Sequence, residues 1–133
     1  MATRIDPREA HAKMAEGYVY VDVRSDVEFA LGRPAGAVNV PLSRMTPTGL
    51  QPEPEAFVAA MKARFPIDAR LVLGCKSGGR SARAAALLEA AGFVAVVDQR
   101  AGWDGERGPF GEVVTPGWRR AGQRPASGAP TRA

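Results

Sequence analysis

The chain has 133 residues, of which 45% are hydrophobic and 24% charged, the size and composition of one globular domain. Its formal charge of +4 comes from residues 119–133, which hold four arginines and no acid. In residues 1–118 the basic groups balance the 14 acidic groups, and no apolar run approaches the ~20 residues of a membrane span. We therefore expect neither a nucleic-acid partner nor a membrane partner.

Composition also divides the chain into a body and a tail. We expect residues 1–118 to form a single domain, and residues 119–133, rich in Pro, Gly and Ala, to form a disordered basic tail. The start of the chain is charged and lacks an apolar signal segment. The single cysteine cannot form an internal disulfide, so we expect a cytoplasmic protein.

Helix and strand signals alternate along residues 5–98. In chain order we expect a helix at 5–17, a strand at 18–23, a helix at 25–32, a strand at 36–41, a helix at 52–65, a strand at 70–75, a helix at 81–92 and a strand at 93–98. Asp6 with Glu9 and Ser25 with Glu28 have the spacing of capping boxes. The strands are apolar without alternation, which favours burial on both faces and an α/β domain with a mainly parallel sheet.

The alternation ends after residue 98. The following segment is rich in glycine and contains Trp103, Phe110 and Trp118. We expect an ordered loop whose aromatic side chains pack on the edge of the core.

The only cysteine, Cys75, stands between the third strand and a strong helix, and cations, glycines and serines follow it. These residues are Lys76, Ser77, Gly78, Gly79, Arg80 and Ser81. Glycines let successive amides turn inward, and free N–H groups at the start of a helix attract anions. This segment, the Cys75 loop (residues 75–81), is expected to favour the thiolate and to bind a small anion. The alternative is that Cys75 is a small buried hydrophobic residue.

Other residues narrow the chemistry. The only histidine, His11, lies in the first predicted helix, so a Cys–His hydrolase is not expected. No cluster of residues has the spacing of metal ligands. Thiolate chemistry on a small anion remains, and both sulfur transfer and phosphoryl transfer fit it.

Three segments carry a family resemblance: "VYVDVRSDVEFALGRPAGAVNVP", "CKSGGRSARAAALLEAAGF" and "AGWDG". Over residues 4–122 the chain resembles the single-domain rhodaneses, which are thiosulfate sulfurtransferases. The resemblance implies a rhodanese-like three-layer α/β domain, with a sheet of about five strands and helices on both faces. Arg33 and Ala101 replace the usual histidine and glycine of the family, at positions that we expect to be structural.

The resemblance also implies a reaction. Cys75 would take the outer sulfur of thiosulfate, a persulfide or 3-mercaptopyruvate, and then pass it to cyanide, a small thiol or a thiol protein. Amides of Lys76 to Ser81 would hold the persulfide, while Lys76 and Arg80 would bind the donor's oxyanion. Trp103 would form a wall of the pocket, and no metal or organic cofactor is implied. We also expect Arg24 to pair with Glu28.

Two alternatives remain beside the enzyme. One is a persulfide carrier, or a sulfur- or redox-sensing interaction module, that does not turn over small acceptors. The other is a thiol phosphatase or arsenate reductase, some of which share this fold. Cys75 and Arg80 enclose four residues, one fewer than in those phosphatases, and the tighter ring favours a single sulfur atom over a phosphate.

Overall fold

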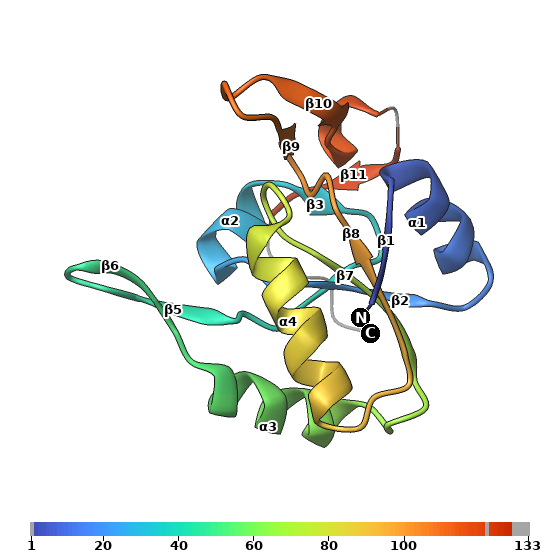
Figure 1. Cartoon of the computed structure of the whole chain (residues 1–133), viewed down its shortest axis with the longest axis vertical. Coiled ribbons are helices and arrows are strands. Elements are labelled where there is room, and N and C mark those ends of the chain that lie inside the picture. Colours follow the sequence, from blue (N-terminus) through green and yellow to red (C-terminus); the bar gives the residue numbers. More distant parts are fainter. Residues whose placement is uncertain (1, 122, 129–133) are drawn as a thin grey trace.

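The computed structural model describes residues 2–121 and 123–128. Its centre is a five-stranded sheet in the order β1-β8-β7-β2-β4, in which all neighbouring strands are parallel (Figure 1). The strands are β1 (Thr3–Ile5), β2 (Val19–Asp22), β4 (Val38–Asn39), β7 (Arg70–Gly74) and β8 (Ala95–Gln99). The prediction of an α/β domain with a parallel sheet of about five strands is confirmed.

Helices cover both faces of this sheet, as expected. They are α1 (Pro7–Ala15) on one face, and α3 (Pro54–Arg64) and α4 (Gly79–Ala90) on the other. In β7, Leu71 and Leu73 pack towards α3 and α4, whereas Val72 packs towards α1, because successive strand residues face opposite sides. Each fully buried side chain of this size contributes about 1.5–3 kcal/mol to folding. Among the described residues, no helix has the length and apolar character to cross a bilayer.

Two helices begin with the predicted capping boxes. In α1 the Asp6 carboxylate accepts from the Glu9 amide, and Glu9 accepts from the Asp6 amide. In α2 (Asp26–Leu31) the boxed residues are Ser25 and Glu28. A cap of this kind contributes about 1 kcal/mol. The second box also fixes the position of Glu28, which reaches the Cys75 loop.

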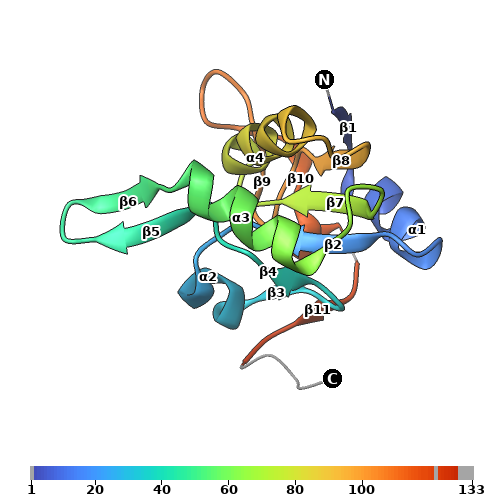
Figure 2. The same ribbon diagram turned by 90° about the horizontal axis from the view of Figure 1, so that it is seen from below.

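Two hairpins were not predicted. The first, β5 (Ser43–Thr46) with β6 (Gly49–Pro52), projects away from the body of the domain in both views (Figures 1 and 2). The second, β9 (Gly105–Arg107) with β10 (Val113–Pro116), occupies the region expected to be a loop. Phe110 in its turn is 95% exposed, so the expectation that it packs on the core was wrong. Trp118, in the short 3-10 helix Trp118–Arg120, is buried as expected.

Part of the basic tail packs on the domain. Residues Pro125–Ala126 form β11, which pairs antiparallel with β3 (Arg33–Pro34). The Trp118 indole N–H donates to the Arg124 carbonyl at 2.8 Å, and the buried Arg33 donates to the Gly128 carbonyl at 2.6 Å. The expected disordered tail thus differs from the structure at these residues, because backbone pairing and Arg33 anchor them. Residues 122 and 129–133 of that expectation lie outside the described residues.

Candidate active site

Cys75 follows β7 directly, at the carboxyl edge of the sheet, and it is 3% exposed. The Gly78 amide donates to its sulfur, with 3.1 Å between N and Sγ. The thiol donates to the Ser81 hydroxyl at 3.4 Å, and that hydroxyl donates to the Gly78 carbonyl at 3.2 Å. Of the predicted loop residues, the structure thus brings Gly78 and Ser81 onto the sulfur.

The geometry of this loop depends on Gly78. Its φ of +103° is left-handed, and a Cβ there would collide with the Arg100 carbonyl oxygen. The residue is the N-cap of α4, which begins at Gly79, two residues before the predicted start. The amino-terminal end of α4, which carries the positive end of the helix dipole, therefore lies beside the sulfur.

The two cations of the loop have carboxylate partners. Arg80 makes two hydrogen bonds to Glu28, Nη1–Oε1 at 2.8 Å and Nη2–Oε2 at 2.9 Å, and both side chains are partly buried. Lys76 is exposed, and its Nζ lies 3.9 Å from Asp104 Oδ2. Ser77 is partly buried, and its predicted role stays a prediction.

The Arg80–Glu28 pair shifts the pKa of both partners. Burial alone would raise the pKa of Glu28, but hydrogen bonds from Arg80 and Ser25 outweigh burial and lower this pKa to about 2. The hydrogen bond to Glu28 raises the pKa of Arg80, against the opposing effect of burial. Both groups are therefore charged at neutral pH.

The predicted Arg24–Glu28 pair was wrong. Arg24 instead turns back onto Asp22 at the end of its own strand, with 2.6 Å between Nη2 and Oδ2, and also donates to the Gly32 carbonyl at 2.6 Å. Both members of this pair are buried, so each charge is compensated locally. Glu28 is then free to meet Arg80.

Trp103 contacts the site through its backbone and flanks it with its ring. Its amide donates to the Cys75 carbonyl at 2.8 Å, and the ring centroid lies 5.5 Å from the Arg24 guanidinium carbon. A Cβ on Gly32 would lie 2.6 Å from the ring, so glycine is needed for this close approach. These contacts fix Trp103 beside the loop, and its role as a pocket wall stays a prediction.

Two charged residues near the loop were not predicted as site residues. Arg4 of β1 donates to the Asp98 carboxylate of β8 and to the Gly78 carbonyl. Asp98 is the last residue of the strand predicted at 93–98. Arg4 lies in a three-residue strand with no apolar run, so the sequence had no signal that would place it here.

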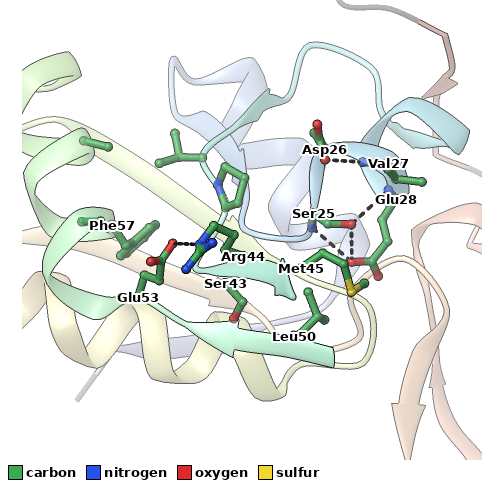
Figure 3. Close-up of a pocket in the computed structure, with 14 residues that line it drawn as sticks. Ser25, Asp26, Val27, Glu28, Ser43, Arg44, Met45, Leu50, Glu53 and Phe57 are labelled. Carbon is green, nitrogen blue, oxygen red and sulfur yellow. Dashed lines mark hydrogen bonds and ion pairs between the residues drawn. The ribbon is translucent and has the colours of Figure 1, made fainter. Parts of the chain in front are cut away.

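A pocket of about 540 Å³ lies between α2, the β5–β6 hairpin and α3 (Figure 3). Val27, Met45 and Leu50 give it an apolar lining, and all three are exposed. Glu28 also lines it, so this residue connects the pocket with Arg80 of the Cys75 loop.

Comparisons with known proteins agree with this geometry. A family model described as a rhodanese-like domain matches residues 6–105. Thiosulfate sulfurtransferase 16 of Arabidopsis thaliana is 37% identical over 89 residues, which are 67% of this chain and 73% of the relative. The human thiosulfate:glutathione sulfurtransferase is 40% identical over 74 residues, or 54% of this chain and 64% of that protein. Other curated relatives are matched over only 55% of their length.

A solved structure extends the likeness over nearly the whole chain. The crystal structure of Rv0390 from M. tuberculosis has a TM-score of 0.77 and 27% sequence identity, and the match covers 96% of this chain and 98% of that one. Two of these relatives are named as sulfurtransferases. The family model and the solved structure show the family and the fold of this chain. The expected resemblance is confirmed, and the chain belongs to the rhodanese-like domain family.

Proposed function

We propose that this protein is a sulfurtransferase that moves a sulfane sulfur from thiosulfate, or a related anionic donor, to cyanide or a thiol. The sulfur travels as a persulfide on Cys75. The contact that supports this proposal most directly is the 3.1 Å hydrogen bond from the Gly78 amide to the Cys75 sulfur, at the start of α4. An amide in this position stabilises a sulfur anion before and after it accepts a second sulfur.

In the first half of the reaction the Cys75 thiolate attacks the outer sulfur of thiosulfate. A new sulfur–sulfur bond forms, the bond to the SO₃ group breaks, and sulfite leaves with the bonding electron pair. In the second half the acceptor attacks the outer sulfur of the persulfide and releases the thiolate. Atoms, electrons and charge balance without an oxidant, a reductant or a metal.

The surrounding groups have separate roles in this scheme. The Ser81 hydroxyl lies 3.4 Å from the sulfur and can turn to donate to it once the thiol has lost its proton. Lys76 is only loosely paired, so it is available to the donor's oxyanion and to the departing sulfite. We propose that Arg80 attracts the donor by its charge, while two of its N–H groups donate to Glu28.

Turnover of thiosulfate and cyanide, followed as thiocyanate, tests the proposal. We expect turnover by the wild-type protein and a loss of more than about 1,000-fold in Cys75→Ser, because a serine hydroxyl is not ionised near neutral pH. Glutathione in place of cyanide tests a thiol as the acceptor. Residual turnover in Cys75→Ser equal to that of the wild type would exclude Cys75 as the sulfur carrier.

The same assay separates the enzyme from a carrier. A protein that takes one sulfur from thiosulfate but passes it to neither cyanide nor small thiols would be a persulfide carrier whose acceptor is another protein. Release of phosphate from an aryl phosphate, abolished in Cys75→Ser, would support the phosphatase alternative instead.

A further inference from the structure

An ion pair joins the neighbouring strands β1 and β8 next to the Cys75 loop. The Arg4 Nε donates to Asp98 Oδ2 at 2.9 Å, and the two residues are register partners in the β1–β8 pairing. The Asp98 side chain is 1% exposed, whereas that of Arg4 is 44% exposed. A buried carboxylate without a charged partner is strongly destabilising, and this cost keeps Arg4 paired with Asp98.

Arg4 uses a second nitrogen to reach the loop. Its Nη2 donates to the Gly78 carbonyl at 3.2 Å, and the same carbonyl accepts from the Ser81 hydroxyl. On its other side, Gly78 donates its amide to the Cys75 sulfur. Gly78 thus connects the Arg4–Asp98 pair with the sulfur, because its carbonyl accepts from Arg4 and its amide donates to Cys75.

Asp98 remains incompletely satisfied in this arrangement. Within the described residues its Oδ1 is buried and has no hydrogen-bond partner. Burial raises the pKa of Asp98, against the opposing effect of Arg4. A buried polar atom without a hydrogen-bond partner destabilises the fold, and such atoms are rare in native proteins. Stability alone does not explain why a carboxylate stands here.

We propose that Arg4 is a positioning residue for Cys75: anchored by Asp98, its guanidinium holds the Gly78 carbonyl and so keeps the Gly78 amide directed at the sulfur. A planar guanidinium can serve both partners at once, which an ammonium group cannot do with the same geometry. The inference builds on the proposed function, because it concerns how the loop holds the sulfur anion. The charged and titratable groups that interact with the Cys75 loop, or with a side chain that does, include Arg4, Tyr20, Asp22, Arg24, Glu28, Lys76, Arg80, Asp98 and Asp104.

The test measures the rate at which iodoacetamide alkylates Cys75, as a function of pH, in Arg4→Ala and Arg4→Lys. We expect both variants to react about fivefold more slowly than the wild type at pH 7, and at the same rate when the thiol is fully ionised at high pH. Lysine keeps the positive charge but lacks the planar guanidinium that donates to both Asp98 and Gly78. If Arg4→Lys were alkylated at the wild-type rate, the charge alone would explain the effect, and the positioning role would be overturned. Alkylation needs no sulfur donor, so this test stands or falls separately from the proposed function.

The matched control is Arg100→Ala. Arg100 also forms an ion pair, with 3.5 Å between its Nε and Glu106 Oε1, and its backbone lies next to Gly78. Its side chain is 29% exposed, and we expect alkylation within about 1.5-fold of the wild type. A slowing equal to that of Arg4→Ala would show that any lost cation has the effect, and would overturn the inference.

Asp98→Asn keeps the test decisive if the Arg4 variants do not fold. Removing a negative charge near the sulfur would by itself speed alkylation at pH 7. Loosening Arg4 has the opposite effect, and we expect a net slowing of about twofold. Thermal unfolding of each variant identifies loss of fold, and faster alkylation in a folded Asp98→Asn would refute the positioning role.

Discussion

Two arginine–carboxylate pairs flank the Cys75 loop, and they differ in what they hold. Arg80 and Glu28 join two side chains by two hydrogen bonds, and both are partly exposed, at 22% and 27%. Arg4 and Asp98 share one hydrogen bond, but the carboxylate is buried and the guanidinium also holds the backbone of the loop. The Arg80–Glu28 pair therefore determines the charge next to the Cys75 loop, and the Arg4–Asp98 pair determines the direction of the Gly78 amide.

This difference predicts how the two sides respond to substitution. A partly exposed pair is screened by solvent and contributes about 0–1 kcal/mol, so its loss should change substrate affinity more than structure. On the second side, the buried carboxylate anchors Arg4, and Arg4 donates to the Gly78 carbonyl, so a change in this pair moves the backbone of the loop. Changes on the second side should therefore alter the reactivity of the sulfur itself.

Among substitutions on the two sides of the loop, the largest effect is expected at Gly78, where the second pair meets the sulfur. In Gly78→Ala a side chain would enter the left-handed region, collide with the Arg100 carbonyl and come within 2.9 Å of Arg4 Nη2. The backbone strain alone costs about 1–3 kcal/mol. We expect a free energy of unfolding lower by about that amount in urea titrations, and thiocyanate formation slower by more than about tenfold.

Gly79→Ala is the control for this prediction. Gly79 is exposed, it is the first residue of α4, and a Cβ there meets nothing within 4 Å. Alanine is favoured over glycine in helices by up to about 1 kcal/mol, so this variant should be as stable as the wild type or slightly more stable. Equal losses in the two variants would show that the loop does not depend on the left-handed turn.

An intermediate effect is expected for the Arg80–Glu28 pair. Arg80→Ala should raise the KM for thiosulfate about fivefold, because it removes a charge that attracts the donor. Glu28→Gln removes the opposing charge and should leave KM unchanged or lower it by about twofold. If both variants only lost stability and kept the wild-type KM, the pair would be structural and Arg80 would have no part in binding the donor.

The smallest expected effect is the loss of the Glu28 contribution to the free energy of unfolding at acid pH. The pKa of Glu28 lies at about 2 in the folded protein, below its usual value of 4.5, so its contribution to stability is complete above pH 4.5 and is lost as the pH falls towards 2. Wild type and Glu28→Gln should therefore differ by at most about 1 kcal/mol near pH 6, after allowance for solvent screening, and should converge near pH 2. Urea titrations across this range measure the difference, and a gap that widens in acid would contradict the assignment.

The pKa of Asp98 shifts in the opposite direction from that of Glu28, so its contribution to stability changes with pH in the opposite way. Burial raises the pKa of Asp98, so the folded state binds a proton more readily than the unfolded chain, and this group stabilises the fold as the pH falls through its pKa. In Asp98→Asn this acid-dependent gain should be absent.

Local signals in the sequence were sufficient for one side of this site. The strand that ends before Cys75, the glycines that follow and the helix after them are consecutive in the chain, so the loop could be predicted from neighbouring residues. Its sulfur chemistry was expected from the family resemblance and is part of the proposed function. The Ser25–Glu28 capping box was also predicted, since its residues lie within one turn. The partner of Glu28 was wrong, because Arg24 is nearer in sequence but turns back to Asp22.

The other side depends on contacts between distant parts of the chain. Arg4 and Asp98 are 94 residues apart, and they meet only because β1 adds to the sheet next to β8. A polar strand of three residues has no periodic pattern, so neither β1 nor the role of Arg4 could be predicted. The same limit applies to β11, whose pairing with β3 holds part of a tail that composition alone suggested was disordered.

The central claim is that Cys75 carries a transferable sulfur, and the intact mass of the protein tests it most directly. After incubation with thiosulfate, the wild-type protein should gain the mass of one sulfur atom on the peptide that contains Cys75, and cyanide should remove it. Cys75→Ser should gain nothing. An unchanged wild-type mass, or a gain that persists in Cys75→Ser, would contradict the account.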